Sequence, residues 1–206
     1  MKREEETRAK APIGRPRGFD ADEALERAMR VFWKKGYEGA GLSDLTEAMG
    51  ITRTSMYAAF GNKEALFSKA LERYTAGPAS YAARAVREPT ARAVAEGFLA
   101  GAVGLTTSPA SPAGCLGVQG ALATGEPGRP AREALAAWRE DGVSLLHDRF
   151  RQASATGDLP PTADPATLAR YLMTVANGIA VQAVGGVGRE ALEEVTRLAL
   201  GAWPSA

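Results

Sequence analysis

Small polar side chains crowd one short stretch of the sequence, TRTSMYAAF, which runs from Thr52 to Phe60. A helix that served only to be buried would carry a wider apolar stripe. If Met56, Ala59 and Phe60 face inward at helical spacing, the outward positions hold hydroxyl groups, one arginine, one tyrosine and one alanine. Side chains of these types and sizes can reach the base edges and phosphates of a DNA duplex.

Each outward side chain has a partner that suits its chemistry. Arg53 fits the O6/N7 edge of guanine. Thr54 and Ser55 can bond either base edges or phosphates, and Ala58 can touch a thymine methyl group. Lys63 follows in the first turn of the next helix, where a cation is unfavourable unless a phosphate sits beside the free N–H groups. Taken alone, the same pattern also fits a small surface helix whose polar face binds nothing.

A helix-turn-helix arrangement would present this face to a partner. We expect one helix over 42–49 and a second from Thr52 or Arg53 to Phe60, with Gly50 in the tight turn, where φ is positive. The apolar side chains that would hold the two helices together are Leu45, Met49, Ile51, Met56 and Ala59.

Capping residues mark the helices on either side of this pair. Asp20 can cap a first helix, with Glu23 completing a capping box, and the helix should end at Gly36. Asn62 can cap a fourth helix. The four helices together form a unit that we expect to span residues 20–77, and Gly77-Pro78 is the first plausible domain boundary.

Residues 1–19 precede the first helix, and we expect them to form a flexible basic arm. Between Thr7 and Phe19 there are four basic residues and no acidic one. The sequence GRPR is too rich in proline and glycine to fold, and its arginines, Arg15 and Arg17, could enter the narrow minor groove beside a helix in the major groove. The alternative is a solvated tail.

The sequence of the remaining two-thirds of the chain also predicts helices, and it contains no strong signal for a β-strand. The segments SPASP, GEPGRP and GDLPPTADP separate them. We expect helices near 79–87, 91–105, 115–124, 129–154, 165–184 and 189–203. The fold class is therefore all-α with about nine or ten helices, in which 78–206 forms a second helical domain.

Composition limits the possible functions. A net charge of +1 neither favours nor excludes nucleic acid. The single cysteine, Cys115, rules out an internal disulfide and suits a reducing cytosol. With one histidine besides, we expect no metal site, and we expect no cofactor. The most apolar stretch, 171–184, is shorter than a bilayer span, and the first ten residues lack the apolar region of a signal peptide. We expect a cytoplasmic protein that does not bind membranes.

A longer segment carries a family resemblance. Residues 31–74, VFWKKGYEGAGLSDLTEAMGITRTSMYAAFGNKEALFSKALERY, resemble the N-terminal DNA-binding domain of the TetR family of bacterial transcriptional regulators. The likeness covers residues 20–74 and is carried by Phe32, Lys35-Gly36-Tyr37, Leu45, Gly50-Ile51, Tyr57, Phe60 and Lys63-Glu64-Ala65-Leu66.

The resemblance implies a homodimer that sets two recognition helices in successive major grooves of a palindromic operator. It places the side chains of Arg53, Thr54, Ser55 and Ala58 near bases. It places Tyr57 and Lys63 on phosphates, and Ser43 where the family often contacts the DNA backbone or a base. It also implies that the C-terminal domain binds an effector and dimerises through its last two long helices.

Two sets of residues in 78–206 follow from this architecture. The apolar positions that we expect in the dimer interface are Leu168, Tyr171, Leu172, Val175, Ile179, Leu192, Val195 and Leu198. The residues that would surround an effector cavity are Phe98, Cys115, Trp138, Met173 and Asn177. Residues of these types also form ordinary cores, and an internal helical hairpin is the alternative for the first set.

The leading function is thus a homodimeric transcriptional regulator, a repressor by family precedent, that binds operator DNA and is released by a small molecule. A second interpretation is an all-α enzyme with an accessory DNA-binding domain, although 78–206 shows no paired carboxylates in an apolar context. A third is a constitutive DNA-binding protein without an effector, which a C-terminal domain lacking an interior cavity would favour.

Overall fold

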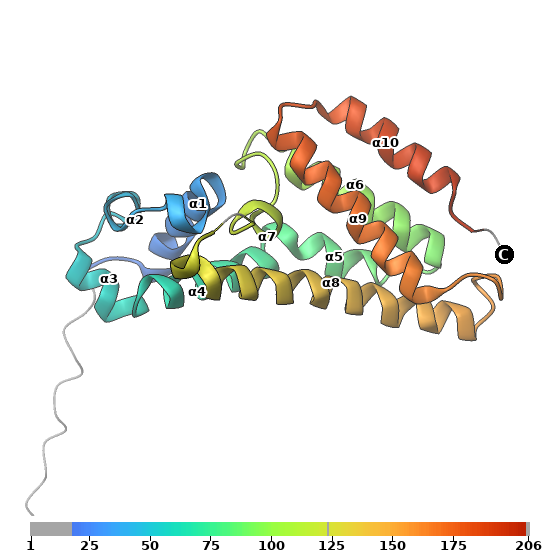
Figure 1. The fold of residues 1–206 in the computed structure, drawn as a ribbon, viewed down its shortest axis with the longest axis horizontal. Helices are drawn as coiled ribbons and strands as arrows, with labels where there is room; N and C mark the ends of the chain where they lie inside the picture. The colour runs from blue at the N-terminus through green and yellow to red at the C-terminus, as the bar shows by residue number, and fades with distance from the viewer. Residues whose placement is uncertain (1–17, 123, 205–206) are drawn as a thin grey trace, which may run out of the picture.

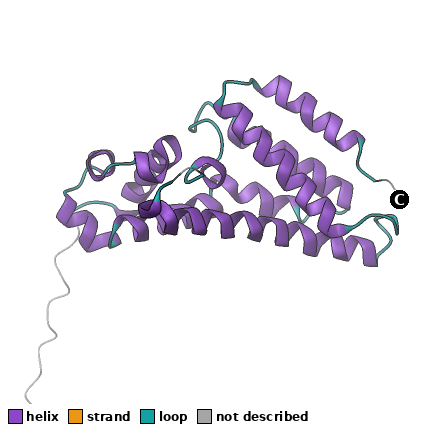
Figure 2. Cartoon of the chain, in the orientation of Figure 1, coloured by secondary structure: helices purple, strands orange, loops and turns teal. Residues whose placement is uncertain are grey.

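The computed structural model describes residues 18–122 and 124–204, and within these ranges the chain is all α-helical, as predicted (Figures 1 and 2). The helix-turn-helix end, with α1, α2 and α3, lies opposite the end formed by α9 and α10, and the long α8 runs along one side of the molecule. The α-helices are α1 (Ala21–Gly39), α2 (Leu42–Met49), α3 (Arg53–Phe60), α4 (Lys63–Ala76), α5 (Tyr81–Ala85), α6 (Ala91–Thr106), α7 (Leu116–Gln119), α8 (Arg129–Ala155), α9 (Pro165–Val184) and α10 (Arg189–Gly201). Short 3₁₀ turns occur at Pro78–Ser80 and Glu126–Gly128.

The helix starts follow the capping residues. The Asp20 carboxylate accepts hydrogen bonds from the backbone amides of Asp22 and Glu23, at 2.8 and 3.1 Å. Asn62 accepts from the amide of Ala65 at 2.7 Å and so caps α4. The predicted capping box at α1 is only half realised, because the Glu23 carboxylate pairs with Arg27 one turn further along the helix.

The end of α1 is more complex than a simple stop at Gly36. Gly36 has φ 70° and ψ 174°, which interrupts the helical backbone, and a further turn continues to Gly39. The interruption frees the amide of Tyr37 to donate to the carbonyl of Gly120 at 2.7 Å. The glycine therefore joins α1 to the segment around α7 instead of only ending a helix.

Two predicted helices are shorter than expected. The helix expected near 115–124 is reduced to the single turn of α7, since the carbonyl of Gly120 is bound by Tyr37 and the carbonyl of Gly117 accepts from Arg139 at 2.8 Å. The helix expected near 79–87 is divided into the 3₁₀ turn at Pro78–Ser80 and the five residues of α5.

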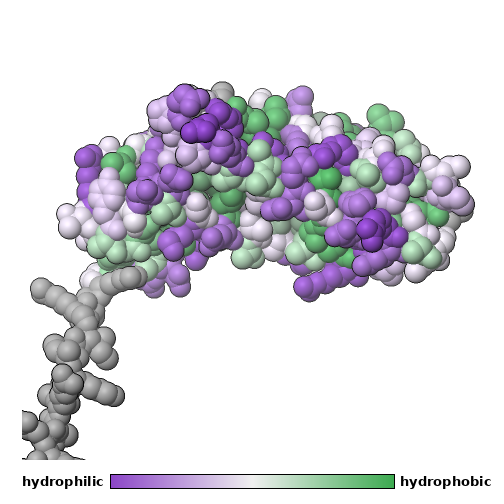
Figure 3. All heavy atoms as spheres, turned by 60° about the horizontal axis from the view of Figure 1, so that its bottom comes forward, coloured by the Kyte–Doolittle hydropathy of each residue, from purple (hydrophilic) through white to green (hydrophobic). Residues whose placement is uncertain are grey.

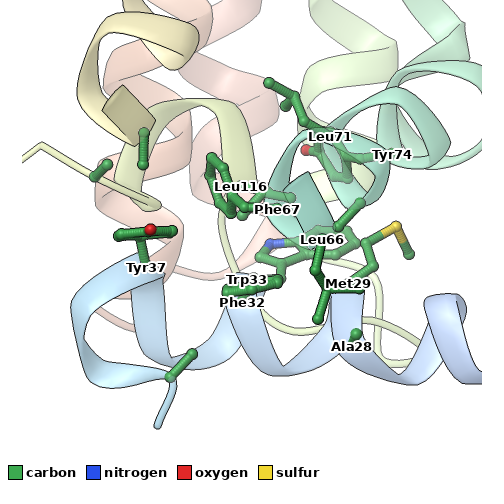
Figure 4. Close-up of a cluster of buried hydrophobic side chains, with 14 of the residues drawn as sticks. Ala28, Met29, Phe32, Trp33, Tyr37, Leu66, Phe67, Leu71, Tyr74 and Leu116 are labelled. Atoms are coloured by element: carbon green, nitrogen blue, oxygen red, sulfur yellow. The ribbon is translucent and has the colours of Figure 1, made fainter. Parts of the chain in front are cut away.

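A first core joins α1, α4 and α7 (Figure 4). The rings of Phe32 and Phe67 meet edge to face, with centroids 5.1 Å apart, and those of Trp33 and Tyr74 do the same at 4.9 Å. Leu116 of α7 belongs to this same buried cluster. This core therefore includes residues on both sides of the boundary expected at Gly77-Pro78.

A second core fills the space between α6, α8, α9 and α10. The large side chains buried in it are Phe98, Leu99, Leu146, Phe150, Leu159, Leu172, Met173, Ile179, Leu192 and Trp203. On the face seen in Figure 3, hydrophilic side chains cover much of the surface, with smaller apolar groups between them.

Replacing the glycine that joins α1 to α7 should lower stability. In Gly36→Ala the new Cβ would lie 3.2 Å from the carbonyl oxygen of Gly120, in a backbone region that side chains rarely adopt. We expect a loss of about 1–3 kcal/mol in the free energy of unfolding, measured by urea denaturation. Gly39→Ala is the matched control, because its Cβ would make only an ordinary contact at 3.6 Å, and a comparable loss in both variants would contradict the role given to Gly36.

Candidate nucleic-acid interface and interior cavity

The turn between α2 and α3 is made by a left-handed glycine. Gly50 has φ 68° and ψ 30°, and its amide donates to the carbonyl of Glu47 at 3.1 Å. The amide of Ile51 donates to the carbonyl of Thr46 at 3.1 Å, which completes the end of α2. Thr52 then caps α3 by accepting from the amide of Ser55, also at 3.1 Å. Both helix ends therefore follow the predicted pattern.

The two faces of α3 are divided as the spacing predicted. Met56 and Phe60 are buried against the rest of the core. The side chains left exposed on the other face are Arg53, Thr54, Tyr57 and Ala58. Ser55 is half-buried, and its Oγ lies 3.0 Å from Oγ1 of Thr52, so part of its hydrogen-bonding capacity is used within the helix start.

A surface depression of about 900 Å³ lies along α2 and α3. Among the residues predicted to contact DNA, it is lined by Ser43, Arg53, Ser55 and Ala58. Thr54 and Tyr57 do not line it. Glu47 does, and sequence reasoning missed this exposed carboxylate, although its position one turn after Ser43 on the same helix could have indicated it.

Lys63 is held in place by an aromatic ring. Its ammonium group lies 4.6 Å from the centroid of the Tyr37 ring, at the start of α4. Burial lowers the pKa of Lys63, and the nearby Glu38 carboxylate opposes that shift. The cation is therefore oriented by a cation–π contact that the sequence alone did not indicate.

Arg15 and Arg17 of the predicted arm lie outside the described residues. The described chain begins at Gly18, which lines the same depression as α3. The ring of Phe19 packs against that of Phe60 with centroids 6.5 Å apart. The chain thus enters the first helix beside α3.

A cavity of about 320 Å³ lies between α5, α6, α8 and α9, and Thr75 of α4 is its one lining residue from the helix-turn-helix half. All five residues predicted to surround an effector line it: Phe98, Cys115, Trp138, Met173 and Asn177. Tyr81, Thr75 and Asp141 line it too and were not predicted. Tyr81 lies on the five residues of α5, which are too few to show a periodicity that could orient its side chain.

Cys115 takes part in the wall of this cavity as a neutral thiol. It is almost fully buried, and the hydroxyl of Tyr74 donates to its sulfur at 3.1 Å. Burial raises the pKa of the Cys115 thiol, while the hydrogen bond from Tyr74 opposes the shift. The group therefore acts as a small apolar side chain with one hydrogen bond.

The segment 114–125 connects the cavity to α1. Cys115 and Val118 of this segment line the cavity. Three hydrogen bonds tie the segment to α1: Trp33 Nε1 to the Gly114 carbonyl at 3.2 Å, the Tyr37 amide to the Gly120 carbonyl at 2.7 Å, and the Gly125 amide to Glu38 Oε1 at 2.8 Å. A change in the cavity wall can thus be transmitted to the first helix.

The side chains predicted in the dimer interface divide into three groups. Leu172, Ile179 and Leu192 are buried in the second core of a single chain, so we remove them from the expected interface. Leu168, Tyr171 and Val175 are half-buried. Val195 and Leu198 are exposed, by 48% and 81%.

Other apolar side chains join this exposed pair. Four of the seven large hydrophobic side chains exposed in the described residues lie on α9 and α10: Val181, Val184, Val195 and Leu198. Val181 was not among the predicted interface residues. None of the described helices combines the length and the apolar character needed to cross a membrane.

Comparison with known proteins covers both halves of the chain. Residues 24–70 match the family described as "Bacterial regulatory proteins, tetR family", and residues 89–198 match "Tetracyclin repressor-like, C-terminal domain". The HTH-type transcriptional repressor ComR of Escherichia coli (strain K12) is 32% identical over 193 residues, which is 93% of this chain and 92% of ComR.

Solved structures agree with this assignment. A cysteine mutant of the TetR family transcriptional regulator CifR, complexed with 26bp double-strand operator DNA, is 44% identical with a TM-score of 0.89, over 92% of this chain and all of that one. A TetR transcriptional regulator from Chloroflexus aurantiacus J-10-FL shares the fold at 19% identity, with a TM-score of 0.77 over 87% of this chain and 91% of that one. The chain therefore belongs to the TetR family of bacterial transcriptional regulators.

Proposed function

We propose that this regulator is a repressor that binds a palindromic operator as a homodimer and leaves it when a small molecule occupies the cavity. The observation that carries the proposal is the exposed polar face of α3 beside a surface depression. The name of ComR, a transcriptional repressor, supports the repressor role, and the operator complex of CifR supports the choice of DNA. Because bacterial DNA lies in the cytoplasm, we also propose that the protein works there.

The side chains of α3 suit the major groove in different ways. Arg53 is exposed at the start of the helix and can bond the O6/N7 edge of guanine. Thr54 and Ala58 complete the base-reading face, while Ser55, already bonded to Thr52, has less capacity left for bases. The Glu47 carboxylate repels phosphates but can accept a hydrogen bond from the amino group of cytosine. It therefore favours an orientation in which this surface faces the base edges in a groove.

Phosphate contacts would flank this reading face. Tyr57 is 48% exposed, and its hydroxyl can donate to a phosphate oxygen. Lys63, oriented by the ring of Tyr37, stands at the N-terminus of α4, where free amides also favour an anion. Ser43 near the start of α2 is exposed and can donate a third such bond. These contacts position the helix and carry no sequence information themselves.

Pairing of two chains would set the distance between two such helices. The exposed apolar side chains of α9 and α10 are the surface we assign to this contact: Val181, Val184, Val195 and Leu198. A two-fold arrangement of two α9–α10 pairs makes a symmetric four-helix interface, in which each patch meets its own copy. The operator should then be an inverted repeat.

Release would follow from the link between the cavity and α1. A ligand that fills the cavity presses on Cys115 and Val118, and the segment 114–125 carries the displacement to α1 through its hydrogen bonds. Trp138 Nε1 donates to Thr75 Oγ1 at 2.8 Å and ties α4 to the same wall. DNA and ligand must then weaken each other by the same coupling free energy. The cavity argues against a constitutive DNA-binding protein without an effector.

Selection of bound sites from random duplex DNA tests the DNA-binding proposal. We expect an inverted repeat, and Arg53→Ala should weaken binding to it by about 1–3 kcal/mol and relax the preference at one base pair in each half-site. Arg151→Ala removes the same charge from an exposed position on α8 and should bind as the unaltered protein does. Equal losses in the two variants, or a selection that enriches no sequence, would contradict the assignment of α3 as the reading helix.

The contribution of the arm is measurable from salt dependence. If Arg15 and Arg17 contact DNA, replacing both with alanine should reduce the slope of log affinity against log salt by up to about 2 per arm. The measurement is a titration of the selected operator at several salt concentrations. An unchanged slope would remove the arm from the interface.

The dimer contact is tested by Leu198→Glu. In the dimer this substitution would bury a charge where the leucine buries apolar area. It should therefore raise the dissociation constant of the dimer at least about tenfold. Light scattering at micromolar concentration should show the shift from dimer to monomer. Leu122→Glu changes another exposed leucine outside α9 and α10 and should leave the dimer intact, so a monomeric unaltered protein, or a dimeric Leu198→Glu protein, would overturn the assignment.

A further inference from the structure

The charges around the cavity limit what it can bind. Of the residues that line it, Asp141 is the one with a carboxyl group, and no lysine, arginine or histidine is among them. Arg139 follows Trp138 on α8, but it donates to the carbonyl of Gly117 and does not line the cavity. An anionic ligand would lose its hydration there, meet no cation and face a carboxylate. Carboxylates and phosphates are therefore poor ligands for this site.

The polar groups in the wall differ in whether they are already bonded. Cys115 accepts from the hydroxyl of Tyr74 behind the wall, Trp138 Nε1 donates to Thr75, and Thr106 Oγ1 donates to the carbonyl of Ala102 at 2.8 Å. By contrast, the Tyr81 hydroxyl and the Asn177 amide make no hydrogen bond to any other residue in 18–122 or 124–204. Both residues are partly accessible and line the cavity, so these two groups are free to bond a ligand that enters it.

Tyr81 is a hydrogen-bond donor in a fixed position. Its ring tilts against that of Phe98, with centroids 5.5 Å apart, and rests where Gly101 has no side chain. A Cβ at Gly101 would lie 2.5 Å from the ring of Tyr81, so the ring can occupy this position only because residue 101 is a glycine. Burial raises the pKa of Tyr81, and its hydroxyl therefore keeps the proton that it would donate.

The size and walls of the cavity also restrict the ligand. A volume of about 320 Å³ is the room taken by about ten water molecules in the liquid, which suits a single substituted ring. Aromatic side chains from three helices, Tyr81, Phe98 and Trp138, border this space together with the adaptable thioether of Met173. Asp141 is exposed to solvent and can remain hydrated when the cavity is filled.

We infer that the cavity takes a compact, uncharged, mainly apolar molecule that carries one hydrogen-bond acceptor for Tyr81, and that aromatic ketones represent this class. The inference rests on the proposed function for its regulatory meaning, since it names the chemical class of the effector. The lack of a cation in the wall argues against anions, the apolar lining and the volume favour a compact apolar molecule, and the unbonded hydroxyl calls for one acceptor.

Four probes of the same branched phenyl shape separate the alternatives: acetophenone, isopropylbenzene, benzoate and benzamidinium. Binding of each to the full-length protein is measured by titration calorimetry at neutral pH, without DNA. Acetophenone should bind about three- to tenfold more tightly than isopropylbenzene, because only it can accept from Tyr81. It should bind at least about tenfold more tightly than benzoate, whose lost hydration no cation in the wall replaces. It should also bind at least about tenfold more tightly than benzamidinium, because the one carboxylate of the wall, Asp141, is exposed and hydrated and compensates little of the lost hydration of a buried cation.

Removal of one oxygen atom tests the role of Tyr81. Tyr81→Phe should cancel the advantage of acetophenone over isopropylbenzene while leaving the affinity for isopropylbenzene unchanged. Tyr171→Phe is the matched control, since the Tyr171 hydroxyl lies outside the cavity and donates to the carbonyl of Ala199 at 3.0 Å. That variant should keep the full advantage of acetophenone.

Three results would overturn the inference: a charged probe that binds most tightly, no binding by any of the four, or an advantage of acetophenone that survives in Tyr81→Phe. Release of the selected operator by acetophenone is measured separately. If acetophenone binds as expected while the operator stays bound, the ligand class stands and the effector-release part of the proposed function fails.

Discussion

The side chain of Tyr74 is the contact on which the two halves of this protein depend. Its ring meets Trp33 of α1 edge to face at 4.9 Å and lies 6.1 Å from Trp138 of α8, while its hydroxyl donates to Cys115 in the cavity wall. It is fully buried, so these contacts are made without competing water. Because α4 carries Tyr74 and directly follows α3, the direction in which α3 faces depends on the cavity wall.

This shared core gives the fold its functional logic. With eight residues, α3 has too little apolar surface to hold its own orientation, and it relies on Met56 and Phe60 to bind it to the neighbouring helices. Those helices are held by the segment 114–125, which also lines the cavity. One continuous set of buried contacts therefore runs from α3 to the cavity, and occupation of the cavity has a physical route to the exposed polar face of α3.

Local features were predictable from the sequence, whereas long-range ones were not. Thr52 and Asn62 cap their helices through bonds to residues three positions away, and the outward face of α3 follows from helical spacing alone. The five cavity residues followed from the family resemblance and not from their spacing. Tyr81 was not predicted as a cavity residue, because α5 is too short to show a helical periodicity. The shortening of α7 was not predictable either, because it depends on hydrogen bonds from Tyr37 and Arg139, which are distant in sequence. Leu172, Ile179 and Leu192 look like interface residues in the sequence because a stripe buried within one chain and a stripe buried between two chains have the same apolar pattern.

The central claim is that α3 and the cavity wall behave as one coupled unit. Hydrogen exchange of the intact protein, with and without its selected operator duplex, tests this most directly. The account predicts slower exchange in residues 52–60, where DNA contacts are assigned, together with a change in the segment 114–125, which DNA does not touch. Slower exchange in 52–60 with no change in 114–125 would contradict the coupling on which the account rests.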